Sequence, residues 1–171
     1  MTYSFIGAGN MARCMIKGFI ENKALSAGEI FAYDIDAARL SEIAETFGIN
    51  TCADASAAAS AADVLVLAVK PNQLEDALRP LLPALQRRKP VIISLPVGIS
   101  LARIEALLDF ELPVVRIVPN VSAEVFASVT AFCANASVTP DDKSKIIQTL
   151  PCFKADKLLN LYGLAHHNLC F

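Results

Sequence analysis

The sequence Phe-Ile-Gly-Ala-Gly-Asn-Met-Ala at residues 5–12 decides the fold, because it predicts a sharp glycine turn between a strand and a helix. Gly7 has no Cβ and can adopt backbone angles that let the chain leave a strand abruptly. Gly9 leaves room for a ligand to approach the backbone. The first N–H groups of the following helix have no partners within it, and together with the helix dipole they favour an anion.

Three features around this turn are typical of a dinucleotide-binding unit. Tyr3–Ile6 precede it as a short apolar strand, and apolar residues recur at helical spacing over residues 11–19. A second apolar strand, residues 30–33, ends in Asp34, about 20 residues beyond the turn, where a ribose hydroxyl needs an acceptor. Ala12 stands where this fingerprint allows Gly or Ala, because the helix must lie close on its strand. The alternative is a strand–turn–helix without a ligand, which the glycine spacing alone does not exclude.

Strands and helices alternate along the rest of the chain. We expect strands at about residues 3–6, 30–33, 50–52, 64–69, 91–95, 114–118 and 128–134, and helices at about 11–22, 37–47, 73–86, 101–108 and 140–150. Asp54 is expected to cap a further short helix, and Gly48 to end the second one. Pro80 and Pro83 fall inside the predicted helix 73–86 and should kink or segment it.

Repeated strand–helix units predict an α/β fold with a doubly wound, mostly parallel sheet. The expected strand order is 3-2-1-4-5-6, with strand 128–134 added at the edge. The first and fourth strands then lie side by side, and ligands bind outside their carboxyl ends, where the chain leaves in opposite directions. Loops 7–12, 69–71 and 119–120 should meet at this crevice, although each could also be an ordinary strand ending. We expect one domain over residues 1–150 and a tail over 151–171.

Composition narrows the function. Of the 171 residues, 54% are hydrophobic and 19% charged, with a formal net charge of −2, so no basic stripe predicts nucleic acid binding. No apolar run approaches the ~18 residues that span a membrane, and no signal peptide is visible, so we expect a cytoplasmic protein without a membrane partner. The five cysteines form no C-x-x-C pair and His166 and His167 are adjacent, so no metal site is predicted.

Four motifs together resemble pyrroline-5-carboxylate reductase. They are residues 5–12, the sequence Ala-Val-Lys-Pro at 68–71, Ile-Ser at 93–94 followed by Gly-Ile at 98–99, and Arg-Ile-Val-Pro-Asn at 116–120. The resemblance covers about residues 3–157 and implies a Rossmann-like fold. It also implies an enzyme that passes a hydride from NADPH or NADH to the imine carbon of 1-pyrroline-5-carboxylate, a small-molecule substrate, to give proline. A protonated imine is already electrophilic, so the protein mainly positions the reactants.

The resemblance also assigns roles to residues. Those implied to hold the pyrophosphate region of the cofactor are Ile6, Gly7, Gly9, Asn10 and Met11. Those implied to line the nicotinamide ribose are Val69, Lys70 and Pro71, and Asn120 is implied to lie near the nicotinamide and the substrate. No residue is identified as catalytic. From the residues themselves, Asp34 and Asp36 should accept bonds from ribose hydroxyls and repel a 2′-phosphate, which favours NADH, although Arg39 could offset this.

The family continues with a helical domain that binds the substrate carboxylate and forms the dimer, and so implies a homo-oligomer. Residues 160–171 do not match the beginning of that domain. We therefore expect this chain to bind the cofactor but to be catalytically incomplete, with 151–171 as the truncated start of the helical domain. One alternative is a non-catalytic nucleotide-binding regulatory or interaction module, which is suggested by Val121-Ser122 where the family has Thr-Pro. The other is the N-terminal domain of another NAD(P)-dependent dehydrogenase.

Overall fold

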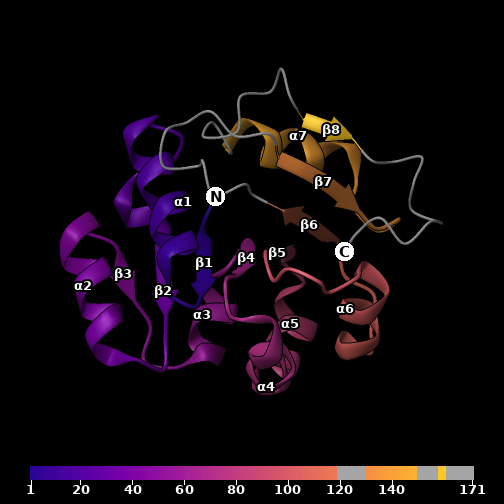
Figure 1. Ribbon diagram of the computed structural model, residues 1–171, viewed down its shortest axis with the longest axis horizontal. Helices are drawn as coiled ribbons and strands as arrows, with labels where there is room; N and C mark the ends of the chain where they lie inside the picture. Colours follow the sequence, from indigo (N-terminus) through magenta and orange to yellow (C-terminus); the bar gives the residue numbers. More distant parts are fainter. Residues whose placement is uncertain (119–129, 150–157, 161–171) are drawn as a thin grey trace.

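An eight-stranded sheet runs through the centre of the computed structural model, which describes residues 1–118, 130–149 and 158–160 (Figure 1). Its strands lie in the order β3-β2-β1-β4-β5-β6-β7-β8. Their bounds are β1 Tyr3–Ile6, β2 Ile30–Tyr33, β3 Asn50–Thr51, β4 Val64–Leu67, β5 Val91–Ser94, β6 Val114–Val118, β7 Thr130–Ala134 and β8 Leu158–Asn160. Only the β6–β7 pair is antiparallel among these described strands. The predicted α/β class and the order of the first six strands are confirmed.

One prediction about the sheet is wrong. Strand 128–134 was expected at the edge, but β8 pairs with the outer side of β7 in parallel register. Leu158–Asn160 lie in the stretch predicted as a tail, and they carry too few residues for any periodicity to be read. β8 pairs with β7, which lies more than 20 residues earlier in the chain, so the local sequence of residues 158–160 does not indicate a strand.

Helices cover both faces of the sheet, as a doubly wound fold requires (Figure 1). The first apolar cluster joins one face to α1 (Asn10–Glu21), α2 (Ala37–Phe47) and α7 (Pro140–Thr149). The second joins the other face to α3 (Ala55–Ala61), α4 (Leu74–Leu78), α5 (Leu82–Arg88) and α6 (Leu101–Leu108). No helix in the described parts of the chain is long and apolar enough to cross a membrane.

The helix ends follow from capping residues. The Asp36 carboxylate accepts the N–H of Arg39 at the start of α2, and Gly48 ends that helix in the left-handed region, with φ 68°. Asp54 and Ser100 cap α3 and α6 in the same way. Such a cap stabilises a helix by about 1 kcal/mol relative to alanine. These local signals explain why the predicted bounds of α2 match the observed ones.

The predicted helix 73–86 is segmented, as its prolines require. A 3-10 helix, η2 (Pro71–Gln73), leads into α4, and a second one, η3 (Arg79–Leu81), separates α4 from α5. Pro80 lies within η3, and Pro83 lies in the first turn of α5, where the missing N–H costs nothing. The segments still bury one continuous side of leucines.

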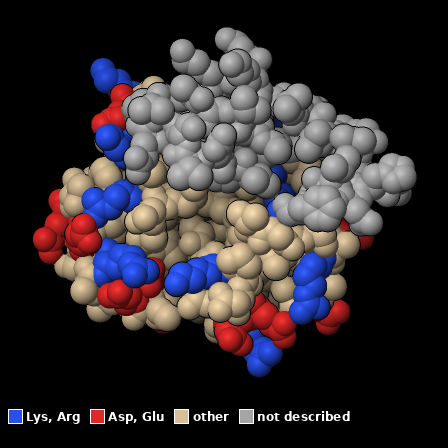
Figure 2. Space-filling view, in the orientation of Figure 1, with Lys and Arg blue, Asp and Glu red and all other residues tan. Residues whose placement is uncertain are grey.

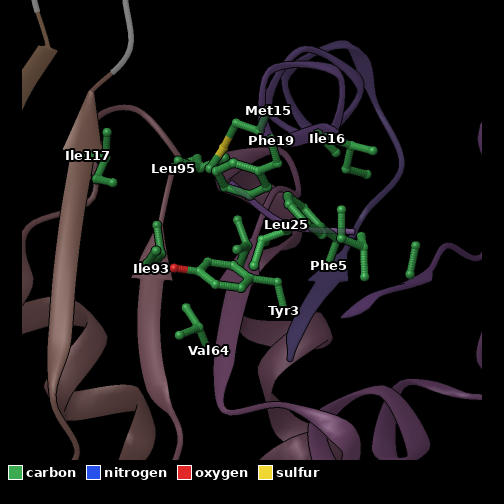
Figure 3. Close-up of a cluster of buried hydrophobic side chains, with 14 of the residues drawn as sticks. Tyr3, Phe5, Met15, Ile16, Phe19, Leu25, Val64, Ile93, Leu95 and Ile117 are labelled. Atoms are coloured by element: carbon green, nitrogen blue, oxygen red, sulfur yellow. The ribbon is translucent and has the colours of Figure 1, made fainter. Parts of the chain in front are cut away.

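Aromatic side chains pack between α1 and the sheet (Figure 3). Tyr3 and Phe5 on β1 both face Phe19 on α1, with ring centroids 5.2 Å and 6.3 Å apart. Tilted aromatic pairs of this kind add about 0.5–1.5 kcal/mol beyond the burial of apolar surface. All three rings are fully buried, so the last turn of α1 is held against β1.

Because the Tyr3 hydroxyl is buried, we expect the free energy of unfolding to fall at alkaline pH. Burial raises the pKa of Tyr3 to about 12, and a hydrogen bond with Thr149 opposes part of this rise. Between the unfolded pKa of about 10 and the folded value, only the unfolded state releases the proton, so unfolding becomes easier as the pH rises. We expect the wild type to lose about 2–3 kcal/mol more than Tyr3→Phe across this range. Urea unfolding at a series of pH values measures the difference, and equal losses in both proteins would contradict the assignment.

Candidate functional site

Three parallel strands end level with one another at the carboxyl edge of the sheet. Ile6 at the end of β1 pairs in register with Tyr33 of β2 on one side and with Leu67 of β4 on the other. The loops that follow therefore begin side by side, with Gly7, Asp34 and Ala68 as their first residues. This is the switch point between the two halves of the sheet, where ligands bind in folds of this kind. The crevice predicted at this point thus has the predicted strand neighbours.

Gly7 is required by the close contact between two of these loops. Its φ is +101°, a backbone conformation that L side chains rarely adopt. A Cβ at this position would lie 2.8 Å from the Ala68 carbonyl oxygen and 3.2 Å from the Val69 nitrogen. Hydrogen bonds hold the backbone on both sides of this contact: the Gly7 N–H donates to Tyr33 O of β2 at 2.8 Å, and the Ala68 N–H donates to Ile6 O at 2.9 Å.

Gly9 leaves the N-terminus of α1 open. It is the N-cap residue, in extended conformation, and no side chain caps the helix. The first helical bond runs from the Arg13 N–H to Gly9 O at 3.0 Å, so the N–H groups of residues 10–12 have no partner within the helix. Among the residues that the structure describes, none has an atom within 4 Å of the position that a Gly9 Cβ would take. An opening lined by free amides and the positive end of a helix dipole fits a pyrophosphate group.

The remaining predicted residues of this loop differ in their exposure to solvent. Ile6 is buried at the end of β1, Asn10 is exposed as the first residue of α1, and half-buried Met11 packs against the core. Of the three, Asn10 alone presents an exposed polar side chain at the opening.

Asp34 is tied to the glycine turn by its own side chain. Its Oδ2 accepts the Ala8 N–H at 2.7 Å, and its Oδ1 accepts the Asp36 N–H at 2.9 Å. The carboxylate therefore bridges the turn after β1 and the turn after β2. Ile35 lies next to it and is 82% exposed, which is unusual for isoleucine. Sequence reasoning did not single out Ile35, although an isoleucine between two acids at a strand end is a signal for it.

The third loop carries the residues predicted to line the nicotinamide ribose. Half-buried Val69 packs against the second apolar cluster, whereas Lys70 and Pro71 are exposed at the start of η2. The structure brings this loop against Gly7, as described above. Asn120, predicted to lie near the nicotinamide, falls outside the described residues, as does the rest of the loop 119–120.

A separate cavity of about 590 Å³ lies at the opposite, amino edge of the sheet. Its lining includes the strand starts Val64 and Val91 and the cations Arg88 and Lys145. Both cations already pair with carboxylates, Arg88 with Asp63 and Lys145 with Asp141. This cavity lies at the opposite edge of the sheet from the glycine turn, so the candidate functional site is the carboxyl edge.

The charged side chains on the surface do not indicate a second binding site in the described part of the chain. Figure 2 shows Lys, Arg, Asp and Glu side chains mainly around the margin of one face, with a largely uncharged, hollowed centre. Among the residues that the structure describes, no group of three or more His, Cys, Asp or Glu side chains is placed to hold a metal ion.

Comparison with known proteins places this arrangement in a family. Residues 2–98 match the family model described as NADP oxidoreductase coenzyme F420-dependent. The pyrroline-5-carboxylate reductase of Escherichia coli K12 is 30% identical over 149 residues, which are 87% of this chain and 55% of that protein. The chain thus spans about half the length of the curated relatives it matches.

Solved structures of pyrroline-5-carboxylate reductases are also similar to this chain. A pyrroline-5-carboxylate reductase from Coxiella burnetii superimposes with a TM-score of 0.83 at 33% identity, over 93% of this chain and 57% of that one. The Plasmodium falciparum pyrroline carboxylate reductase, solved with NADP bound, has a TM-score of 0.78 over 90% of this chain and 55% of that one, and at 21% identity it supports the fold alone. The resemblance predicted from the motifs is confirmed, and the chain belongs to the family of NADP oxidoreductases described as coenzyme F420-dependent.

Proposed function

We propose that this chain is the dinucleotide-binding part of a reductase that transfers a hydride from NADH or NADPH to 1-pyrroline-5-carboxylate. The observation that carries the proposal is the opening at Gly9, where an uncapped helix N-terminus faces space that a Cβ would enter. The family description and the reductases similar in sequence support the choice of a nicotinamide dinucleotide and of this substrate.

The proposed roles follow from the geometry of the three loops. The free N–H groups of residues 10–12 bind the pyrophosphate, and Gly9 lets it come close to the backbone. Asp34 accepts bonds from the adenosine ribose, and Val69 and Lys70 border the other ribose. The bound reduced dinucleotide supplies the hydride. The iminium carbon of the substrate is electrophilic once its nitrogen is protonated, so these loops act by orienting the reactants rather than by covalent chemistry.

Fluorescence titration tests the proposal. We expect the enhanced emission of bound NADH or NADPH to saturate when protein is added. Free AMP should compete, because it carries the same adenosine and a phosphate. Absence of saturable binding by both dinucleotides would contradict the proposal.

A steady-state assay with 1-pyrroline-5-carboxylate separates an enzyme from a nucleotide-binding module. Dinucleotide oxidation that depends on this substrate would exclude the non-catalytic alternative. Saturable binding without substrate-dependent oxidation would leave the cofactor site supported and would favour the module for these 171 residues.

A further inference from the structure

We propose that the turn after β2 makes this chain selective for NADH over NADPH, with Asp34 as the residue that sets the preference. The inference rests on the proposed function, since it concerns the same cofactor site. It departs from the NADP named in the family description, so it distinguishes this chain from what membership alone would suggest.

The first step is that the Asp34 carboxylate is held in place. Backbone N–H groups from two different loops, those of Ala8 and Asp36, bind its two oxygens at 2.7 Å and 2.9 Å. Ala8 lies between the two glycines of the turn, so the carboxylate sits directly beside the opening at Gly9. A group that extends from there toward the end of β2 would pass close to this carboxylate.

The second step is that Asp34 still has acceptor capacity of the right kind. An ionised carboxylate offers about four acceptor positions and no donor. The two backbone bonds use two of them, which leaves acceptors for ribose hydroxyls. A ribose 2′-hydroxyl can donate to such an oxygen, whereas a 2′-phosphate carries about −1.5 to −2 charges and has no comparable donor.

The third step is that two arginines and one helix N-terminus near this turn, in the described part of the chain, already have carboxylate partners. The N-terminus of α2 is capped by the Asp36 carboxylate, which accepts the Arg39 N–H. The Arg39 guanidinium lies 3.5 Å from the same carboxylate. On α1, Arg13 pairs with Glu42 and lies over the Phe47 ring. A phosphate at this turn would therefore meet the Asp34 and Asp36 carboxylates, and both arginines would be shared with a carboxylate.

Titrating the chain with both dinucleotides tests the inference through the ratio of the two dissociation constants. We expect NADH to bind at least tenfold more tightly than NADPH. Asp34→Ser and Asp34→Asn should shift the ratio toward NADPH by about tenfold or more, mainly through weaker NADH and stronger NADPH binding. Asp34→Asn keeps a carbonyl oxygen for the Ala8 N–H, so it removes the charge with less disturbance of the turn. The ratio is also unaffected by partial unfolding, because both ligands titrate the same folded fraction.

Two control variants separate charge from structure. Ile35→Ser alters the same turn without changing its charge, and Asp141→Asn removes one carboxylate from α7, at the other edge of the sheet. Both should leave the ratio unchanged. Tighter binding of NADPH by the wild type, or an equal shift in Ile35→Ser, would overturn the inference while leaving the proposed function in place. If neither dinucleotide binds, both fail.

Discussion

Replacing Gly7 by alanine is expected to lower the free energy of unfolding by about 3–5 kcal/mol. Two costs combine. The first is the backbone conformation, since φ +101° is strained for any residue with a Cβ. The second is the contact, because the new Cβ would lie 2.8 Å from a backbone carbonyl oxygen that two neighbouring strands hold in place. A domain of this size has only about 5–15 kcal/mol of stability, so much of the protein would unfold under mild conditions.

Gly48→Ala is the matched control for this prediction. Gly48 also has a positive φ, of 68°, but its nearest neighbour would be the Ala27 Cβ at 4.0 Å. Only the conformational cost applies there, and we expect a loss of about 1–2 kcal/mol. Urea unfolding of the two variants isolates the contribution of the contact between the loops. Equal losses would mean that the loop after β4 moves aside, and that Gly7 does not fix its position.

Most helices and strands could be predicted from the sequence, because the capping residues are local signals and the apolar residues recur at regular spacing. The bounds of α2 could be predicted from a capping aspartate and a terminal glycine, and the buried runs at β4 and β5 from their continuous apolar character. β8 could not be predicted, because three residues show no period and their partner strand is distant. Pro80 and Pro83 predict a break in the helix over residues 73–86. Whether that break is a kink or a 3-10 turn depends on how the segment packs against α3 and α6.

The candidate site was predictable as a set of loops but not as a set of contacts. The glycine spacing and the acid after β2 indicated which loops meet. That Asp34 binds the Ala8 N–H, and that Gly7 lies against the Ala68 carbonyl, depends on strand register. Register is a tertiary property, set by which apolar faces pack together, and no single segment of this chain encodes it.

Replacing Gly9 by aspartate is expected to weaken dinucleotide binding by at least about 100-fold, which corresponds to about 2.7 kcal/mol. The introduced carboxylate would enter the space proposed for the pyrophosphate and would repel it. It would also accept the N–H groups at the start of α1, which are the donors proposed for the ligand. The variant therefore removes the amides and adds a like charge at once.

The same substitution should leave the fold intact, and this separates it from Gly7→Ala. No atom of the described part of the chain lies within 4 Å of the new Cβ, and φ at Gly9 is −74°, which any residue can adopt. Aspartate caps a helix slightly better than glycine, so the free energy of unfolding should stay constant or rise by a few tenths of a kcal/mol. Gly28→Asp is the matched control, because Gly28 is equally open but precedes β2, at the opposite edge of the sheet. Undiminished NADH and NADPH binding by a folded Gly9→Asp protein would show that the ligand does not use this opening, and the site would have to be sought elsewhere.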